Sequence, residues 1–193
     1  MALLMLPMGA RPAPPAPTIA PAVVKPPVVV AAAGPFSITP ERRALLNTIR
    51  YAEGTWKGGS VAGYQVLYGG GRFGDLSRHP EITVRRRYIS AAAGAYQFLP
   101  TTWKRAAQRL RLRDFRPESQ DQAALHLVQQ RGALKRFDRQ GLSADVLARL
   151  APEWASLPTL QGASHYGQPV KSREELQRFY DRELDRQRRL VSA

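Results

Sequence analysis

The sequence predicts an α+β domain that is mainly helical, with a small β-hairpin region flanking a cleft. Two observations predict this class. Beyond residue 37, five segments carry apolar residues at helical spacing and begin at capping residues. Between residues 58 and 89 the pattern changes to glycines, aromatic residues and β-branched residues, which is typical of a short twisted hairpin with long loops. Helices on one side and a small sheet on the other leave a cleft between them.

The first predicted helix places an acid next to its apolar stripe. Thr39 is an N-cap residue, Pro40 suits the first turn, and Gly54 is a usual helix stop. Glu53 follows Ile49 by four positions, so it flanks the apolar face. Partial burial and the negative end of the helix dipole both raise the pKa of such a carboxyl, as a general acid near neutral pH requires. The alternative is a solvated or ion-paired surface glutamate.

Four further helices are expected after residue 100. Trp103 and Trp154 lie on their apolar stripes or at their ends, which favours positions in the core. The last helix also shows the spacing of a capping box, with a serine followed three residues later by glutamate. The expected capping residues are, in order, Thr101, Ser119, Ser143 and Ser172.

The chain divides near Gly34. Residues 1–36 hold nine of the sixteen prolines, and Arg11 and Lys25 are their only charges. Proline-rich stretches of this kind are extended and bury no core. We therefore expect a disordered Pro/Ala-rich arm, or the remnant of an export segment, over residues 1–36 and one folded domain over residues 37–193. The apolar start of the chain is too short to span a bilayer, so no transmembrane segment is expected.

Seven segments downstream of Glu53 form an ordered set. Together with Glu53-Gly54-Thr55 they resemble the lambda-phage lysozyme family, whose members are lytic transglycosylases despite the name. The resemblance runs from Thr39 to the C-terminal helix and implies a lysozyme-like α+β fold. The segments are residues 64–70, 73–80, 91–99, 114–121, 131–134, 154–158 and 166–168.

The resemblance also implies site residues. Glu53 matches the catalytic glutamate of the family by its Glu-Gly-Thr context. Tyr96 and Gln97, with Tyr166 and Gln168, match segments that line the saccharide cleft in the family. Sugar binding needs flat apolar faces together with amide or hydroxyl groups, which these side chains supply. The alternative for the tyrosines is a core position with the hydroxyl satisfied.

A glycosidase usually needs a second carboxylate. Asp75, in the loop-rich segment, is the best candidate for it and for substrate binding, with Asp114 behind it. The alternative for Asp75 is a loop aspartate that holds backbone amides. The resemblance implies a route without a second carboxylate, in which Glu53 protonates the MurNAc–GlcNAc β-1,4 bond and a 1,6-anhydromuramyl end forms. A hydrolytic muramidase is the runner-up.

The composition limits the possible binding partners and cofactors. A formal charge of +14 attracts polyanions such as nucleic acid, acidic membranes or an anionic cell wall. The resemblance implies that the partner is the glycan strands of peptidoglycan, and we expect a monomer to bind them. A non-catalytic wall-binding module and a nucleic-acid-binding protein remain as alternatives, although no nucleic-acid-binding motif accompanies the arginines. The chain has no cysteine, and its three histidines lack metal-ligand spacing, so no metal or cofactor is expected. The resemblance implies action in the periplasm or cell wall, after secretion or delivery by a phage.

Overall fold

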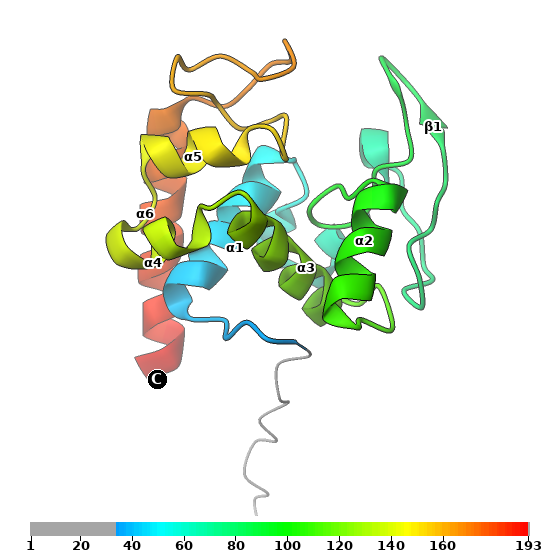
Figure 1. Cartoon of the computed structure of the whole chain (residues 1–193), viewed down its shortest axis with the longest axis horizontal. Coiled ribbons are helices and arrows are strands. Elements are labelled where there is room, and N and C mark those ends of the chain that lie inside the picture. Colours follow the sequence, from blue (N-terminus) through cyan, green and yellow to red (C-terminus); the bar gives the residue numbers. More distant parts are fainter. Residues whose placement is uncertain (1–33, 193) are drawn as a thin grey trace, which may run out of the picture. The chain divides into compact units, whose positions relative to one another are not determined.

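Helices form about half of the described chain, which is residues 34–192 of a computed structural model (Figure 1). The disordered arm or export remnant predicted for residues 1–36 lies almost wholly outside the described residues. None of the described helices combines the length and the apolar character needed to cross a membrane. The helices are α1 (Pro40–Ala52), α2 (Pro100–Leu110), α3 (Pro117–Gln130), α4 (Leu134–Gln140), α5 (Ala144–Leu150) and α6 (Arg173–Ser192).

The predicted hairpin region contains a two-stranded antiparallel sheet, which confirms the hairpin but makes it shorter than expected. Val84 lies opposite Ser90, and Arg85 lies opposite Ile89. The rest of the region consists of short 3-10 turns and loops, and glycines in them adopt positive φ angles. The elements are η1 (Lys57–Gly59), η2 (Val61–Gln65), η3 (Tyr68–Gly70), β1 (Val84–Arg85) and β2 (Ile89–Ser90).

Three helices begin at the predicted caps. The side chains of Thr39, Ser143 and Ser172 each accept a hydrogen bond from the backbone N–H three residues further on, at 3.1 to 3.3 Å. The predictions for Thr101 and Ser119 are wrong, because α2 and α3 begin earlier, at prolines. Proline is favoured at the first helical position, since its φ is already helical and it has no N–H to satisfy there. The short helix α4 was not predicted.

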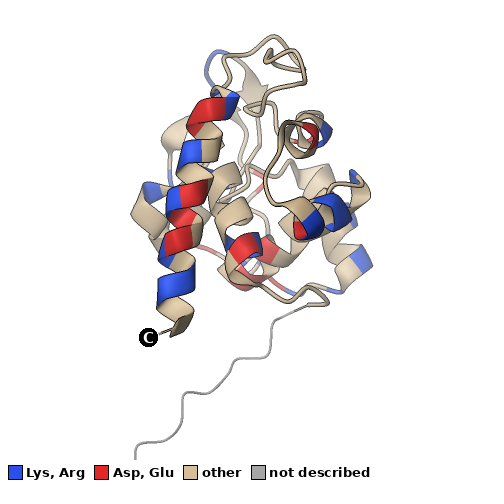
Figure 2. Cartoon of the chain, turned by 90° about the vertical axis from the view of Figure 1, so that its left-hand side faces the viewer, with Lys and Arg blue, Asp and Glu red and all other residues tan. Residues whose placement is uncertain are grey.

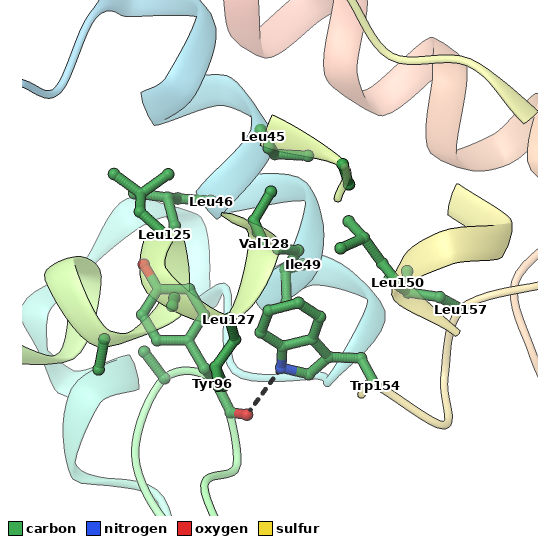
Figure 3. Packing of buried hydrophobic residues seen from close by; sticks show 14 of the residues in the cluster. Leu45, Leu46, Ile49, Tyr96, Leu125, Leu127, Val128, Leu150, Trp154 and Leu157 are labelled. Carbon is green, nitrogen blue, oxygen red and sulfur yellow. Dashed lines mark hydrogen bonds between the residues drawn. The ribbon is translucent and has the colours of Figure 1, made fainter. Parts of the chain in front are cut away.

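The core lies where α1 crosses α3 and meets the chain after α5 (Figure 3). Helix α6 packs along α1. Trp103 and Trp154 are both buried, as predicted. The Trp154 indole N–H donates to the backbone oxygen of Tyr96 at 3.1 Å, so the end of α5 is tied to the loop before α2. Core residues labelled in Figure 3 include Leu45, Leu46, Ile49, Leu125, Val128, Leu150 and Leu157.

A buried ionic network joins α1, η2 and the loop before α2 to α3. Asp121 of α3 is 3% exposed and accepts hydrogen bonds from the hydroxyls of Tyr64, at 2.8 Å, and Tyr96, at 2.5 Å. The guanidinium of Arg43 donates to its other oxygen at 2.5 Å. One buried carboxylate therefore holds three segments of the chain together.

The folded domain begins earlier than the predicted boundary after residue 36. Phe36 is 7% exposed and belongs to the core. Its N–H donates to the side-chain oxygen of Gln122 at 2.9 Å, and the amide of Gln122 donates back to the Phe36 oxygen at 2.8 Å. A Cβ at Gly34 would lie 2.6 Å from the same oxygen of Gln122, so a side chain there would displace the Gln122 amide from Phe36. Gly34 and Phe36 therefore belong to the folded domain.

A chain that starts at Gly34 should melt like the full-length protein, whereas one that starts at Ser37 should be less stable. The shorter chain loses the buried Phe36 ring and leaves the Gln122 amide without its partners. Loss of a buried phenylalanine costs about 3–5 kcal/mol, and each kcal/mol lowers the melting temperature by about 2–4 °C in a domain of this size. Thermal unfolding of the two truncated proteins is the measurement. Equal melting temperatures would show that Phe36 is dispensable.

Candidate active site

A cleft of about 700 Å³ brings together segments that are far apart in the chain. Its walls come from the end of α1, the β1–β2 hairpin, the loop before α2, the end of α3 and the connection between α5 and α6. The cleft carries both acidic groups and neutral hydrogen-bonding groups. Its charged and polar lining residues include Glu53, Tyr68, Ser90, Gln97, Thr102, Arg105, Gln130, Arg131, Glu153, Tyr166 and Gln168.

Glu53 stands at the C-terminal cap of α1. Its N–H completes the helix by donating to the Ile49 oxygen at 2.9 Å, and Gly54 then turns the chain away with a φ of 72°. The carboxyl group therefore points into the cleft from a rigid helix end. The hydroxyl of Ser156 donates to its Oε1 at 2.5 Å.

Burial raises the pKa of Glu53 to about 7, and the hydrogen bond from Ser156 opposes part of that rise by stabilising the carboxylate. A carboxyl with this pKa is partly protonated at neutral pH. The same group can then donate a proton in one step and accept one in the next. This is the acid–base behaviour that the sequence predicted, although burial is its main cause.

Activity should decline as the pH rises through about 7, since Glu53 loses the proton that it must donate. Ser156→Ala should move this decline to higher pH, because removing the donor destabilises the carboxylate and raises the Glu53 pKa further. The kcat/KM for a soluble glycan fragment, measured against pH, tests both statements. Ser192→Ala, at an exposed position of α6, is the matched control. An activity that still climbs at about pH 9 would contradict a raised carboxylic acid.

Gln97 enters the cleft from a strained backbone position, with a φ of 48°. Its side-chain amide donates to the oxygens of Val66, at 3.1 Å, and Gly94, at 2.9 Å. These bonds fix the side chain through its nitrogen. Its oxygen has no hydrogen-bond partner within residues 34–192 and is available to a ligand.

Tyr166 and Gln168 line the cleft from the loop between α5 and α6. Tyr166 is 56% exposed, and its hydroxyl donates to the Pro152 oxygen at 2.7 Å. Its ring is therefore held in place with a face open to solvent. The structure thus places Glu53, Gln97, Tyr166 and Gln168 around one cleft, and their roles there stay predictions.

Two other predicted substrate-binding residues have their side chains engaged elsewhere, although Tyr96 still contributes to the cleft lining. The Tyr96 ring is fully buried with its hydroxyl on Asp121, so no face of it can receive a sugar. Asp75 lies in an exposed loop outside the cleft lining, and its Oδ1 accepts the N–H of Ser77 at 2.8 Å. It therefore holds a backbone turn, as the alternative for it stated. Asp114 has a similar local role, since it accepts the N–H of Arg116 at 3.1 Å.

The sequence did not single out two functional candidates. Ser156 lies within segment 154–158, but nothing local shows that it reaches Glu53 across 103 positions. Glu153 also lines the cleft, and its Oε2 accepts the Nε and Nη2 of Arg131 at 3.1 and 2.8 Å. Glu153 directly precedes the buried Trp154, and Ser156 follows it by two positions. The tryptophan is the signal that could have drawn attention to both. Among residues 34–192 no group of three or more His, Asp or Glu side chains could hold a metal ion.

Comparison with known proteins places this geometry in a family. The Endolysin family model matches residues 43–186. The chain is 40% identical to an endolysin of Escherichia phage lambda over 136 residues, which are 68% of this chain and 83% of the relative. It is 37% identical to an endolysin of Escherichia phage P2 over 147 residues, covering 69% of this chain and 86% of the relative.

Solved structures agree with the sequence match. A structure of bacteriophage lambda lysozyme complexed with a chitohexasaccharide superposes with a TM-score of 0.70 and 34% identity, covering 77% of this chain and 97% of that one. A second structure of lambda lysozyme gives a TM-score of 0.62 and 31% identity, covering 80% and 96% of the two chains. The chain therefore belongs to the endolysin family and has the lysozyme-like α+β fold of the lambda-phage enzyme, as its ordered motifs predicted.

Proposed function

We propose that the protein is a peptidoglycan lytic transglycosylase in which Glu53 is both the acid and the base. Membership of the endolysin family supports a glycan-cleaving enzyme of the cell wall. The observation that carries the finer proposal is the Glu53 carboxyl, held at a helix end in the cleft with a pKa of about 7. A single group that must give a proton and then recover one needs a pKa of this kind.

The reaction follows from that geometry in two proton transfers. Protonated Glu53 donates to the glycosidic oxygen, the bond to C1 of the muramyl ring breaks, and the N-acetyl group of the substrate helps to stabilise the positive charge at C1. Ionised Glu53, stabilised by the hydroxyl of Ser156, then takes the proton of the C6 hydroxyl on the same ring. The C6 oxygen bonds to C1, so a 1,6-anhydro end forms and no water is consumed.

The other cleft residues supply positioning in this proposal. The free side-chain oxygen of Gln97 can accept the N–H of an N-acetyl group, and the open face of the Tyr166 ring can stack against a sugar. Gln168 adds an amide to the same wall. The chitohexasaccharide bound by the related lambda lysozyme is a polymer of N-acetylated sugars, which supports binding of such a glycan here.

One observation favours hydrolysis as a second candidate function. Glu153 places another carboxylate in the cleft, and a hydrolase needs such a group to activate water or to act as a nucleophile. In the transglycosylase proposal this carboxylate only pairs with Arg131. Its replacement therefore distinguishes the two reactions.

The mass of the products from purified peptidoglycan tests the proposal. A transglycosylase releases anhydromuropeptides, which are one water lighter than hydrolysis products, and Glu153→Gln should keep both the product and a rate close to wild type. Hydrolysed ends, together with a loss of about 10² or more in rate for Glu153→Gln, would establish a muramidase instead. If the wild-type protein releases no soluble product, it is a binding module.

A further inference from the structure

The β1–β2 hairpin carries three consecutive arginines at the edge of the cleft. Arg85, Arg86 and Arg87 are exposed and occupy the end of β1 and the turn. The turn is closed by the N–H of Arg86, which donates to the oxygen of Tyr88 at 2.9 Å. We refer to residues 84–90 as the arginine hairpin.

The arginine hairpin is hydrogen-bonded to the cleft wall and forms part of it. The N–H of Tyr88 donates to the hydroxyl of Tyr68 at 3.3 Å, and Tyr68 lines the cleft. Ser90, at the other end of the hairpin, lines the cleft as well. The side chain of Arg86 packs over Gly69, where a Cβ would lie 2.9 Å from its Cγ. A ligand in the cleft is therefore close to the hairpin.

The charges of the arginine hairpin are not neutralised within the described chain, although Arg87 lies over the ring of its neighbour Tyr88, 5.5 Å from the centroid. None of its three arginines forms an ion pair with an acidic side chain of residues 34–192. Arg105 lines the cleft in the same unpaired state. The carboxylates of the cleft do not offset them, since Glu153 is already paired with Arg131 and burial favours the neutral form of Glu53.

The substrate of the proposed reaction carries complementary charges in one place. The sugar rings of peptidoglycan are neutral, and the lactyl carboxyl of MurNAc is consumed in the amide bond to the peptide stem. The negative charges of the polymer therefore lie on the free carboxylates of the peptide stems, and guanidinium groups bind carboxylates well. We propose that the arginine hairpin binds the peptide-stem carboxylates of the glycan in the cleft, an assignment that rests on the proposed function.

The position of the hairpin favours a peptide stem over a membrane surface. Tyr88 and Ile89 are 45% and 59% exposed, and an arginine-rich tip with apolar side chains could also meet anionic lipid. The hairpin is, however, hydrogen-bonded through its backbone to the cleft-lining Tyr68, and its own Ser90 lines the cleft. A peptide stem attached to a sugar in the cleft can therefore reach the hairpin without a second binding surface.

The test compares two triple variants in a Glu53→Gln background, so that glycan fragments are not cut. One replaces Arg85, Arg86 and Arg87 by glutamine, which keeps most of each side-chain stem. The control makes the same change in α6, on the opposite side of the domain from the hairpin (Figure 1), where acidic and basic residues share the exposed face (Figure 2). The control positions, exposed and outside every ion pair within residues 34–192, are Arg178, Arg182 and Arg189.

Dissociation constants are measured for two soluble glycan strands of equal length, one with free peptide stems and one with the stems removed. We expect the hairpin variant to bind the peptide-bearing strand about 3- to 100-fold more weakly, the range for three exposed charge pairs. Its affinity for the bare strand should change by less than about twofold, and the α6 control should be within the same limit for both strands. The contrast should shrink at high salt, since charges at the surface are screened.

Three results would overturn the assignment. An equal loss in the α6 control means that only net charge matters. An equal loss on the bare strand means that the hairpin contacts or shapes the glycan site. Unchanged affinity for the peptide-bearing strand, with weaker binding to phosphatidylglycerol vesicles, assigns the hairpin to a membrane surface. Cleavage by the wild-type protein is measured separately. If the protein does not cut glycan but the hairpin variant still loses affinity only for the peptide-bearing strand, the proposed function is refuted and the hairpin assignment stands.

Discussion

We expect Glu53→Gln to abolish the cleavage of peptidoglycan and to leave the fold intact. The amide keeps the shape of the side chain but can neither donate nor recover a proton. General acid–base groups contribute about 10² to 10⁴ in rate, and the loss should reach the upper end because one residue serves both steps. Release of soluble muropeptides, with circular dichroism as the check on folding, is the measurement.

The same variant has a second signature in its stability. Burial raises the Glu53 pKa from its ordinary value near 4.5 to about 7, so the folded wild-type protein binds this proton more tightly than the unfolded chain does. The stability linked to that proton is present below pH 4.5 and is lost as the pH rises through about 7. Glu53→Gln should therefore melt above wild type at pH 8 and close to it at pH 4. A variant that cleaves at a near wild-type rate would remove Glu53 from the mechanism.

The second large effect is expected on stability, from Asp121→Asn. Asp121 is buried and binds Arg43 and two tyrosine hydroxyls, so the amide leaves the guanidinium charge without a partner and turns one acceptor into a donor. Removing one partner of a buried pair costs about 3–5 kcal/mol. Thermal unfolding should show a fall of roughly 10 °C or more for a domain of this size.

Asp138→Asn is the matched control for this prediction. Asp138 pairs with Arg42 at 2.8 Å, and Arg42 and Arg43 are neighbours on α1. The side chain of Asp138 is 35% exposed, whereas that of Asp121 is 5% exposed, so the two variants differ in burial and in the two tyrosine hydroxyls that bind Asp121. An exposed pair is worth about 0–1 kcal/mol, which predicts a small change in the free energy of unfolding. Equal losses in the two variants would show that burial does not set the strength of the Asp121 network.

Local signals in the sequence determined three helix starts and the position of the acid. Thr39, Ser143 and Ser172 cap their helices as predicted, because a capping bond spans only three residues. Glu53 could be located for the same reason, since the helix stop beside it and the apolar stripe before it are both local. The ordered motifs also predicted the family and the fold, which the comparisons confirm.

Contacts between distant segments were decided only by the tertiary structure. The sequence does not show that Ser156 meets Glu53, or that Tyr96 turns its hydroxyl to Asp121 and buries its ring. It also does not show that Phe36 exchanges hydrogen bonds with Gln122, 86 positions away, and so belongs to the folded domain. Periodicity and capping report on neighbours within one turn of helix, whereas hydrogen bonding and burial at the cleft depend on which helices meet. The pKa of about 7 at Glu53 therefore belongs to the packed domain and not to the helix that carries it.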